Sequence, residues 1–176
     1  MNDTISIATI ATPLGNISAA SSLRGLVYLG FGERARILAE AWARRWLPDA
    51  ALLGEQPAPP DLAAQIAAYF TGELREWSLA LDLRGTPFQI QAWRALCQIP
   101  YGTTRAYSEH AAVIGHPRAV RAVGAANGAN PISLIVPCHR LIGKDGALVK
   151  YGGGLDIKRR LLELEGALGS DARHAA

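Results

Sequence analysis

The sequence Pro137-Cys138-His139-Arg140 places a thiol directly before an imidazole. A thiol is a strong nucleophile only as the thiolate, which a nearby imidazole, cation or helix N-terminus favours. An imidazole and a guanidinium both follow Cys138 at once. The stretch therefore predicts a reactive cysteine with His139 as its base.

The chain path limits how this pair can act. Adjacent residues on a regular strand point to opposite faces, so cooperation of Cys138 with His139 requires a bend or a bridging water. Pro137 restricts the backbone where the bend would lie. An isolated cysteine is otherwise a small apolar core residue. The apolar run 132–136, rich in β-branched residues, favours a reactive cysteine, because it predicts a buried strand that delivers Cys138 to its polar end.

The N-terminal part of the chain reads as an α+β unit. Residues 4–12, 16–22 and 25–31 predict three strands of an antiparallel meander with short turns between them. Helices are predicted over 33–47, with Ile37, Leu38 and Ala41 facing inward, and over 61–70. Residues 77–83 alternate as a strand would. This unit carries no evident chemistry, and we expect it to support the rest.

The following part of the chain is mainly helical. Thr86, Pro87 and Gln89 predict a capped helix start, and Pro100 ends that helix near Ile99. Residues 107–114 and 117–128 predict two short helices with the spacing of a helix-turn-helix. Small residues dominate the expected outer side of the second helix, so its backbone can approach a partner closely: Ala119, Ala122, Gly124, Ala125, Ala126, Gly128 and Ala129. It offers few of the side chains that read base edges in the major groove.

Several ordered motifs make the chain resemble the O6-alkylguanine-DNA alkyltransferases, which move an alkyl group from guanine to their own cysteine. Besides 137–140, the motifs are Gly85-Thr86-Pro87-Phe88-Gln89, Ile99-Pro100-Tyr101-Gly102-Thr103, residues 121–131, Tyr151-Gly152-Gly153-Gly154-Leu155 and Leu161-Leu162-Glu163-Leu164-Glu165-Gly166. The resemblance spans about 85–166 and extends more weakly to Thr12-Pro13-Leu14-Gly15. It implies an α+β fold with a ribonuclease H-like N-terminal antiparallel sheet, followed by a helical domain with the helix-turn-helix.

The resemblance assigns roles to individual residues. Cys138 would accept the alkyl group, His139 would take its proton through a water, and Glu165 would orient His139. Tyr107 would promote base rotation and donate toward the guanine ring, and Asn130 would tie the preceding helix to the cysteine loop. The DNA-binding residues would be Arg121, Tyr107, Ala122, Gly124, Ala125, Tyr151, Gly152 and Gly153, with Arg121 filling the gap left by the flipped base.

Glu165 is also singled out by its own position. It lies in the last turn of a helix predicted over 156–165, where the helix dipole disfavours negative charge. Its i−4 and i−3 neighbours are Leu161 and Leu162, which cannot pair with it. A frayed surface glutamate is the alternative to a tertiary partner, for which His139 is the best candidate.

Composition narrows the classes of protein. The chain has 176 residues, 49% of them hydrophobic, and a net charge of +3. Residues 1–84 carry seven basic and nine acidic side chains, whereas residues 85–170 carry ten and five, which suits a polyanionic partner. Two cysteines exclude a disulfide scaffold, and Cys97 reads as a helix core residue. No histidine or cysteine spacing indicates a metal site.

These observations predict three segments: a supporting domain over 1–84, a DNA-binding and acceptor domain over 85–170, and a disordered tail over 171–176. The first residues lack the basic start of a secretory signal and no apolar run could span a membrane, so we expect a cytoplasmic protein. The resemblance implies a monomer, acting alone or cooperatively on double-stranded DNA without sequence preference. It implies no cofactor and one transfer per molecule, from O6-alkylguanine or O4-alkylthymine through the minor groove.

Three other functions fit parts of the pattern. A non-catalytic relative that senses damaged bases would usually lack Cys138. A cysteine hydrolase would need an oxyanion site and usually a nucleophile at a helix N-terminus. A helix-turn-helix regulator would need base-reading side chains. Within the resemblance, Lys150 is a departure, since a small or uncharged residue usually precedes Tyr151, and its charge would act at the rim of the base pocket.

Overall fold

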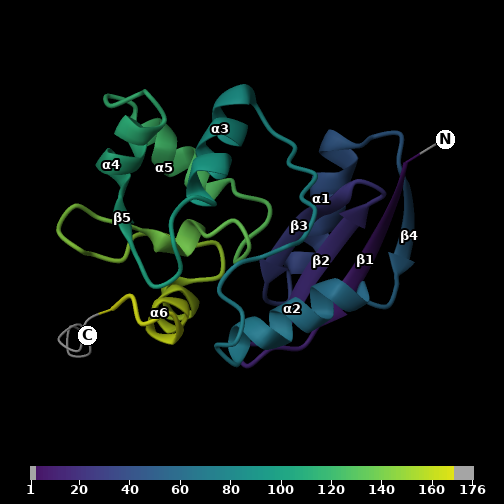
Figure 1. The fold of residues 1–176 in the computed structure, drawn as a ribbon. Helices are drawn as coiled ribbons and strands as arrows, with labels where there is room; N and C mark the ends of the chain where they lie inside the picture. Colours follow the sequence, from purple (N-terminus) through teal and green to yellow (C-terminus); the bar gives the residue numbers. More distant parts are fainter. Residues whose placement is uncertain (1–2, 169–176) are drawn as a thin grey trace.

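The protein folds as an N-terminal sheet unit and a helical C-terminal unit that pack against each other (Figure 1). The computed structural model describes residues 3–168. The tail predicted for residues 171–176 lies outside this range. In the described part, no helix is long and apolar enough to cross a membrane.

The N-terminal sheet has four strands in the order β3-β2-β1-β4. Strands β1 (Thr4–Ile10), β2 (Ile17–Ser22) and β3 (Gly25–Phe31) pair antiparallel, so the predicted meander is confirmed. Strand β4 (Ala51–Glu55) pairs parallel with β1 and makes the sheet mixed. We had not predicted this edge strand, which is partly exposed and contains Gly54 at φ +72°.

Helix α1 (Ala35–Trp46) covers one face of the sheet with its alanines. Ala35, Ala39 and Ala43 are buried there, whereas Ile37 and Leu38 are 65% and 49% exposed. The predicted inward face of Ile37, Leu38 and Ala41 is therefore wrong. Alanines four residues apart form one stripe of a helix, and their small size lets the helix lie close to the strands.

The other face of the sheet packs against helix α2 (Pro60–Phe70) and the C-terminal unit. Leu62, Ile66 and Tyr69 are the buried residues of α2. The strand predicted over 77–83 is absent as a regular element: only Leu81 forms an isolated bridge, with Leu26 of β3. Residues 77–83 therefore contact β3 at the edge of the sheet but do not add a regular strand to it.

Four α-helices form the C-terminal unit: α3 (Pro87–Leu96), α4 (Tyr107–Val113), α5 (Val120–Gly128) and α6 (Leu155–Leu164). The predicted capping box of Thr86 and Gln89 is present at the start of α3. Helix α5 begins three residues later than predicted, because Pro117 and Arg118 form a turn closed by the Ala119 N–H to the carbonyl of His116.

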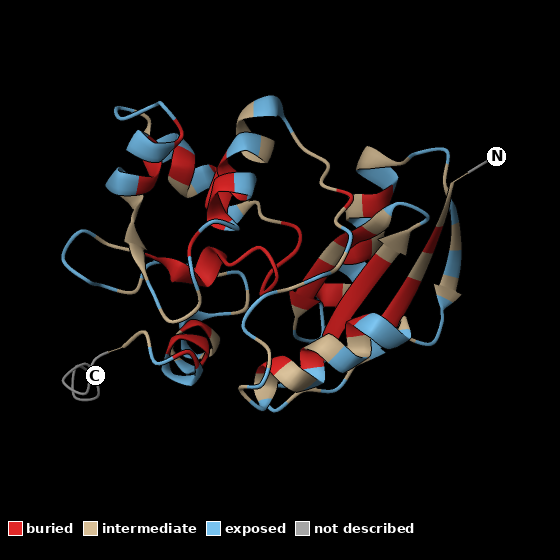
Figure 2. Ribbon diagram, in the orientation of Figure 1, coloured by how far each residue is buried: buried red, intermediate tan, exposed pale blue. Residues whose placement is uncertain are grey.

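Cys138 begins the first of two short elements. The 3₁₀ helix η1 (Cys138–Arg140) leads into β6 (Leu141–Ile142), which pairs parallel with β5 (Arg105–Ala106) at the start of α4. All residues from 131 to 141 are buried, and Figure 2 shows this loop as part of the buried interior between the two units. The chain around Cys138 is therefore fixed by core packing.

Candidate active site

The segment before Cys138 is a buried turn and not the strand predicted over 132–136. Its backbone pairs with Leu29 of β3, which donates to the carbonyl of Pro131 and accepts from the N–H of Ser133. Leu134 then adopts φ +73° while its side chain is fully buried. A left-handed leucine costs on the order of 1 kcal/mol or more, which the surrounding core must offset. Cys138 and His139 themselves lie in the 3₁₀ helix η1, so they are not adjacent residues of a regular strand.

Cys138 lies at the floor of a cavity of about 400 Å³. Its side chain is 3% exposed. The other lining residues are Asn127, Gly128, Lys150, Tyr151, Gly152, Gly154 and Leu155. A reactant must therefore enter the cavity to reach the sulfur.

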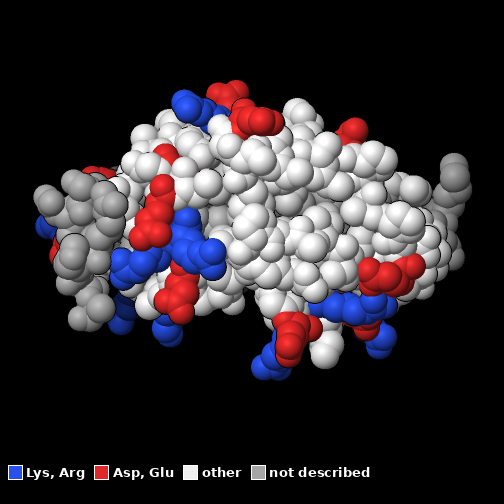
Figure 3. All heavy atoms as spheres, turned by 90° about the horizontal axis from the view of Figure 1, so that it is seen from below, with Lys and Arg blue, Asp and Glu red and all other residues white. Residues whose placement is uncertain are grey.

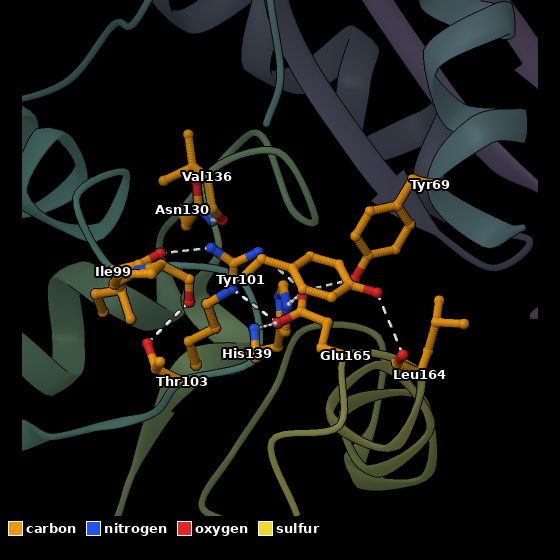
Figure 4. A network of polar contacts seen from close by, with 12 residues as sticks. Tyr69, Ile99, Tyr101, Thr103, Asn130, Val136, His139, Leu164 and Glu165 are labelled. Atoms are coloured by element: carbon orange, nitrogen blue, oxygen red, sulfur yellow. Dashed lines mark hydrogen bonds and ion pairs between the residues drawn. The ribbon is translucent and has the colours of Figure 1, made fainter. Parts of the chain in front are cut away.

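His139 does not line this cavity but belongs to a polar network with Glu165 (Figure 4). Its Nε2 lies 2.8 Å from Oε1 of Glu165, and both side chains are fully buried. The predicted partnership of His139 with Glu165 is thus present in the structure. Nδ1 of His139 is buried and has no hydrogen-bond partner among the described residues.

Arg140 completes the pairing of Glu165. Its Nε and Nη2 each donate to the carboxylate at 2.9 Å, and its Nη1 donates to the carbonyl of Ile99. The guanidinium that follows Cys138 therefore serves Glu165 and does not act as the partner of the thiolate. Tyr69 of α2 also donates to Glu165, at 2.7 Å.

The network fixes the charge states of its members. Burial opposes ionisation of Glu165, but hydrogen bonds from His139 and Arg140 outweigh it and lower the pKa from 4.5 to about 2. Burial lowers the pKa of His139, and the charge of Arg140 adds to this against the raising effect of Glu165. His139 is therefore a neutral imidazole held by a carboxylate, the state in which it can accept a proton.

The pKa of the Cys138 thiol depends on burial, on Lys158 and on nearby polar groups. Burial raises the pKa of Cys138, while Asn130 and the ammonium of Lys158 lower it. Lys158 is fully buried on α6 and donates to the carbonyls of Leu141 and Val149 at 2.6 and 2.8 Å. Burial lowers the pKa of Lys158 to about 8, so a cation persists near the sulfur at neutral pH.

Two asparagines join α5 to the cysteine loop. Asn130 donates to the carbonyl of Val136 at 2.8 Å and accepts from the N–H of Ile132 at 3.1 Å. Asn127 donates to the hydroxyl of Tyr107 at 3.2 Å and, weakly, to the carbonyl of Cys138 at 3.5 Å. Because the Tyr107 oxygen accepts from Asn127, its own proton is free for another acceptor.

The outer face of α5 is exposed and almost without bulk. Arg121, Ala122, Ala125 and Gly128 are exposed, and Gly124 is half-buried with open space where a Cβ would lie. Ala126, which we expected on this outer side, is 3% exposed and packs into the core. Arg121 is thus the one large side chain among these outer residues.

Tyr151, Gly152 and Gly154 line the same cavity as Cys138, whereas Gly153, which we expected at the site, does not line it. The Tyr151 ring lies 6.4 Å from that of His139, and its buried hydroxyl has no partner among the described residues. A Cβ at Gly153 would meet Tyr151, Ile157 and Phe31 at 3.1 to 3.3 Å, so the close packing of this loop favours glycine there. Lys150 is exposed at the cavity rim, where we expected it.

The sequence interpretation missed four residues of this site: Tyr69, Asn127, Arg140 as a partner of Glu165, and Lys158. Lys158 left a signal, since it shares a helix face with the buried Leu161 and Leu162. The interpretation of Cys97 as a core residue is wrong, because this residue caps α3 and is exposed. It follows the last buried positions of the helix, where the chain turns outward.

No group of three or more His, Cys, Asp or Glu side chains within residues 3–168 could hold a metal ion. The chemistry that these residues can perform is nucleophilic attack by a buried sulfur on a group brought into the cavity, with a neutral imidazole as base. The exposed small-residue helix beside the cavity offers a surface for a large partner.

Comparisons with known proteins agree on one family. The DNA binding domain of 6-O-methylguanine DNA methyltransferase matches residues 87–167, and its ribonuclease-like domain matches residues 5–83. A methylated-DNA–protein-cysteine methyltransferase of Methanosarcina barkeri is 46% identical over 159 residues, which is 89% of this chain and 94% of the relative.

Solved structures give the same result. The O6-methylguanine methyltransferase of Mycobacterium tuberculosis has a TM-score of 0.78 at 42% identity, covering 96% of this chain and 98% of the other. Mycobacterium tuberculosis OGT in complex with DNA has a TM-score of 0.78 at 43% identity, covering 92% and 93%.

Proposed function

Because this chain belongs to the 6-O-methylguanine DNA methyltransferase family, we propose that it repairs DNA by moving an alkyl group from guanine O6 to its own Cys138. One observation carries the proposal. A buried thiol forms the floor of a cavity, and the next residue is a neutral imidazole fixed by a buried carboxylate. That arrangement suits a single displacement at sulfur in a site that excludes bulk water.

The proton of Cys138 leaves through His139. Nε2 of His139 donates to Glu165, so Nδ1 is the nitrogen left to accept a proton, and it has no partner among the described residues. A water between Sγ and Nδ1 would complete the path. The ammonium of Lys158 favours the resulting thiolate by its charge.

The thiolate then attacks the alkyl carbon. The carbon–sulfur bond forms as the carbon–O6 bond breaks, and guanine leaves with the bonding electron pair. Tyr107 donates its free hydroxyl proton toward the guanine ring as negative charge develops there. The product is a thioether, which is a very poor leaving group, so each molecule acts once and uses no cofactor.

The damaged base must leave the duplex to react, because Cys138 is buried. Helix α5 would enter the minor groove with its small outer residues, Ala122, Gly124 and Ala125, against the sugar-phosphate backbone. Arg121 would occupy the vacated place in the base stack. Tyr151 and Gly152, which line the cavity, would form the wall against which the flipped base lies, and Gly153 would pack close to the Tyr151 ring.

The substrate is double-stranded DNA that carries O6-alkylguanine, and in this proposal also O4-alkylthymine, in any sequence context. Phosphate contacts would supply most of the affinity, because α5 carries few side chains able to read base edges. The protein would act in the cytoplasm as a monomer that binds alone or cooperatively.

Mass spectrometry of the intact protein tests this function. After exposure to a duplex with one O6-methylguanine, the protein should gain one methyl group, about 14 Da by covalent bookkeeping, and peptide mapping should place it on Cys138. A molar excess of DNA should not increase the number of methyl groups per molecule.

The matched control is Cys138→Ser, which keeps the shape of the pocket but lacks a thiolate. It should bind the duplex and gain no methyl group. Repeated turnover by one molecule, or methylation of Cys97 in place of Cys138, would contradict the proposal.

A further inference from the structure

Tyr69 brings the N-terminal unit into direct contact with the acceptor network. It lies near the end of α2, and its side chain is 1% exposed. Its hydroxyl donates to Oε1 of Glu165 at 2.7 Å, and the same oxygen lies 2.8 Å from Nε2 of His139 (Figure 4). One carboxylate oxygen thus accepts from a residue of each unit.

The ring of Tyr69 is held by aromatic neighbours, independently of its hydroxyl. It stacks on Trp77 at 5.2 Å between centroids and meets Phe70 and Tyr101 edge-on at 5.4 and 6.0 Å. These contacts fix where the hydroxyl points. They also mean that phenylalanine can fill the same space, so the hydroxyl can be removed without emptying the core.

A hydroxyl on a carboxylate changes its strength as an acceptor. Each donor that stabilises the ionised carboxylate reduces the electron density available to the remaining donors. Here the other donor of interest is the imidazole that must take the proton of Cys138. A carboxylate with fewer donors would bind imidazolium more strongly and make His139 easier to protonate.

We propose that Tyr69 is a positioning residue of the acceptor site, whose hydroxyl orients the Glu165 carboxylate and limits how strongly that carboxylate stabilises protonated His139 at rest. This inference rests on the proposed function. It gives the N-terminal unit a direct part in the chemistry: that unit supplies the donor which keeps the base in its neutral, proton-accepting form.

Other charged and titratable groups face the same pair. Arg140 of η1 donates to Glu165. Beyond the effect of burial, the charge of Lys158 on α6 lowers the pKa of His139, and the charge of Cys138 raises the pKa of Lys158. Tyr101 and Tyr151 contribute their rings, and Arg75 lies over the ring of Tyr101. Tyr69 differs from the cations because its removal changes a hydrogen bond without changing the net charge.

The test is Tyr69→Phe, with Tyr101→Phe as its matched control. The Tyr101 hydroxyl donates to the backbone carbonyl of Leu164 at 3.2 Å, at the edge of the same aromatic cluster. Both variants lose one hydroxyl and keep their ring. Thermal unfolding should show that both remain folded.

Single-turnover transfer rates are measured against pH for the three proteins. The acid limb, where His139 becomes protonated, should move to higher pH in Tyr69→Phe, so that rates on that limb fall about threefold to tenfold. The alkaline plateau should change little. The limb of Tyr101→Phe should coincide with that of the parent protein.

A second measurement does not need DNA. Nitrogen-15 NMR of the histidine rings, with His139 assigned through His139→Gln, should show a higher pKa for His139 in Tyr69→Phe than in the parent. An unmoved pKa and limb would overturn the inference, and so would equal shifts in both variants. If the parent protein transfers no alkyl group, the proposed function fails, whereas the NMR result still decides the role of Tyr69.

Discussion

The carboxylate of Glu165 lies where the helix dipole and burial disfavour a negative charge, yet three side-chain donors stabilise that charge. It lies at the C-terminal end of α6, where the helix dipole disfavours a negative charge, and it is fully buried. Three side chains donate to it, and one of them is a guanidinium. Because Arg140 neutralises its charge, Glu165 can hold His139 without drawing a proton onto it.

The lowered pKa of Glu165 predicts a pH-dependent contribution to stability. A carboxyl whose pKa falls from 4.5 unfolded to about 2 folded stabilises the protein by about 3 kcal/mol above pH 5. That contribution is lost as the pH falls from about 4.5 toward 2. Denaturant unfolding of the parent and of Glu165→Gln measures it, since the glutamine does not titrate.

The free energy gap between the two proteins should be largest above pH 5 and should shrink steadily below it. The gap at neutral pH also contains the cost of leaving Arg140 buried without its carboxylate. That part does not vary with pH in this range. A gap of constant size from pH 6 to pH 3 would show that Glu165 is not ionised against its partners in the way described.

The sequence predicts those residues of this site that can be recognised from their neighbours in the chain. Cys138 and His139 are adjacent, and Glu165 lies at a helix end among leucines that cannot pair with it. Tyr69 gave no such signal, because its spacing from Leu62 and Ile66 is that of an ordinary buried helix face. Its partner is 96 residues away in the chain, and only the packing of the two units brings them together.

At the level of elements, the errors came from apolar runs that fit more than one conformation. Residues 132–136 are all buried and three of them are β-branched, as in a buried strand, yet Leu134 at φ +73° turns the chain. Burial on all sides removes the alternation that identifies a strand. In α1, the helical period was right and the buried face was wrong, because alanine packs against the sheet where Ile37 and Leu38 would be too large.

Helix α5 makes a prediction that separates base extrusion from chemistry. Arg121→Ala should slow transfer from a duplex but leave reaction with free O6-benzylguanine, if the pocket admits it, nearly unchanged, because a free base needs no extrusion. Arg121 is exposed on the outer face, so its loss should not disturb the core. Single-turnover rates with both substrates measure the difference.

The control is Ala112→Leu, at an exposed position of α4 outside the proposed contact face. It should leave both rates unchanged. Equal slowing of both reactions in Arg121→Ala would show that this side chain supports the cysteine pocket. Helix α5 would then no longer be assigned as the element that enters the DNA.

The net charge differs between the N-terminal and the C-terminal parts of the chain. Residues 1–84 carry a net charge of −2 and residues 85–170 one of +5. The face shown in Figure 3 carries acidic and basic side chains side by side, with a broad area between them that is uncharged. The overall charge of +3 therefore does not by itself define a DNA-binding surface; what matters is where the basic residues lie relative to the cavity and α5.

Two variants with the same net charge distinguish charge from its placement. Arg118→Gln removes an exposed cation in the turn before α5, and Arg44→Gln removes an exposed cation from α1 of the sheet unit. Each lowers the net charge of +3 by one. Duplex affinity is measured from low to moderate salt, where the slope of log affinity against log salt reports the phosphate contacts.

If DNA lies along α5, Arg118→Gln should reduce that slope by about one, the loss of a single phosphate contact. Arg44→Gln should retain the parent slope, because its cation lies on the sheet unit, away from the proposed contact. Equal reductions in both variants would mean that the overall charge of the molecule governs binding. The segregation of basic residues into the C-terminal unit would then have no part in directing α5 toward DNA.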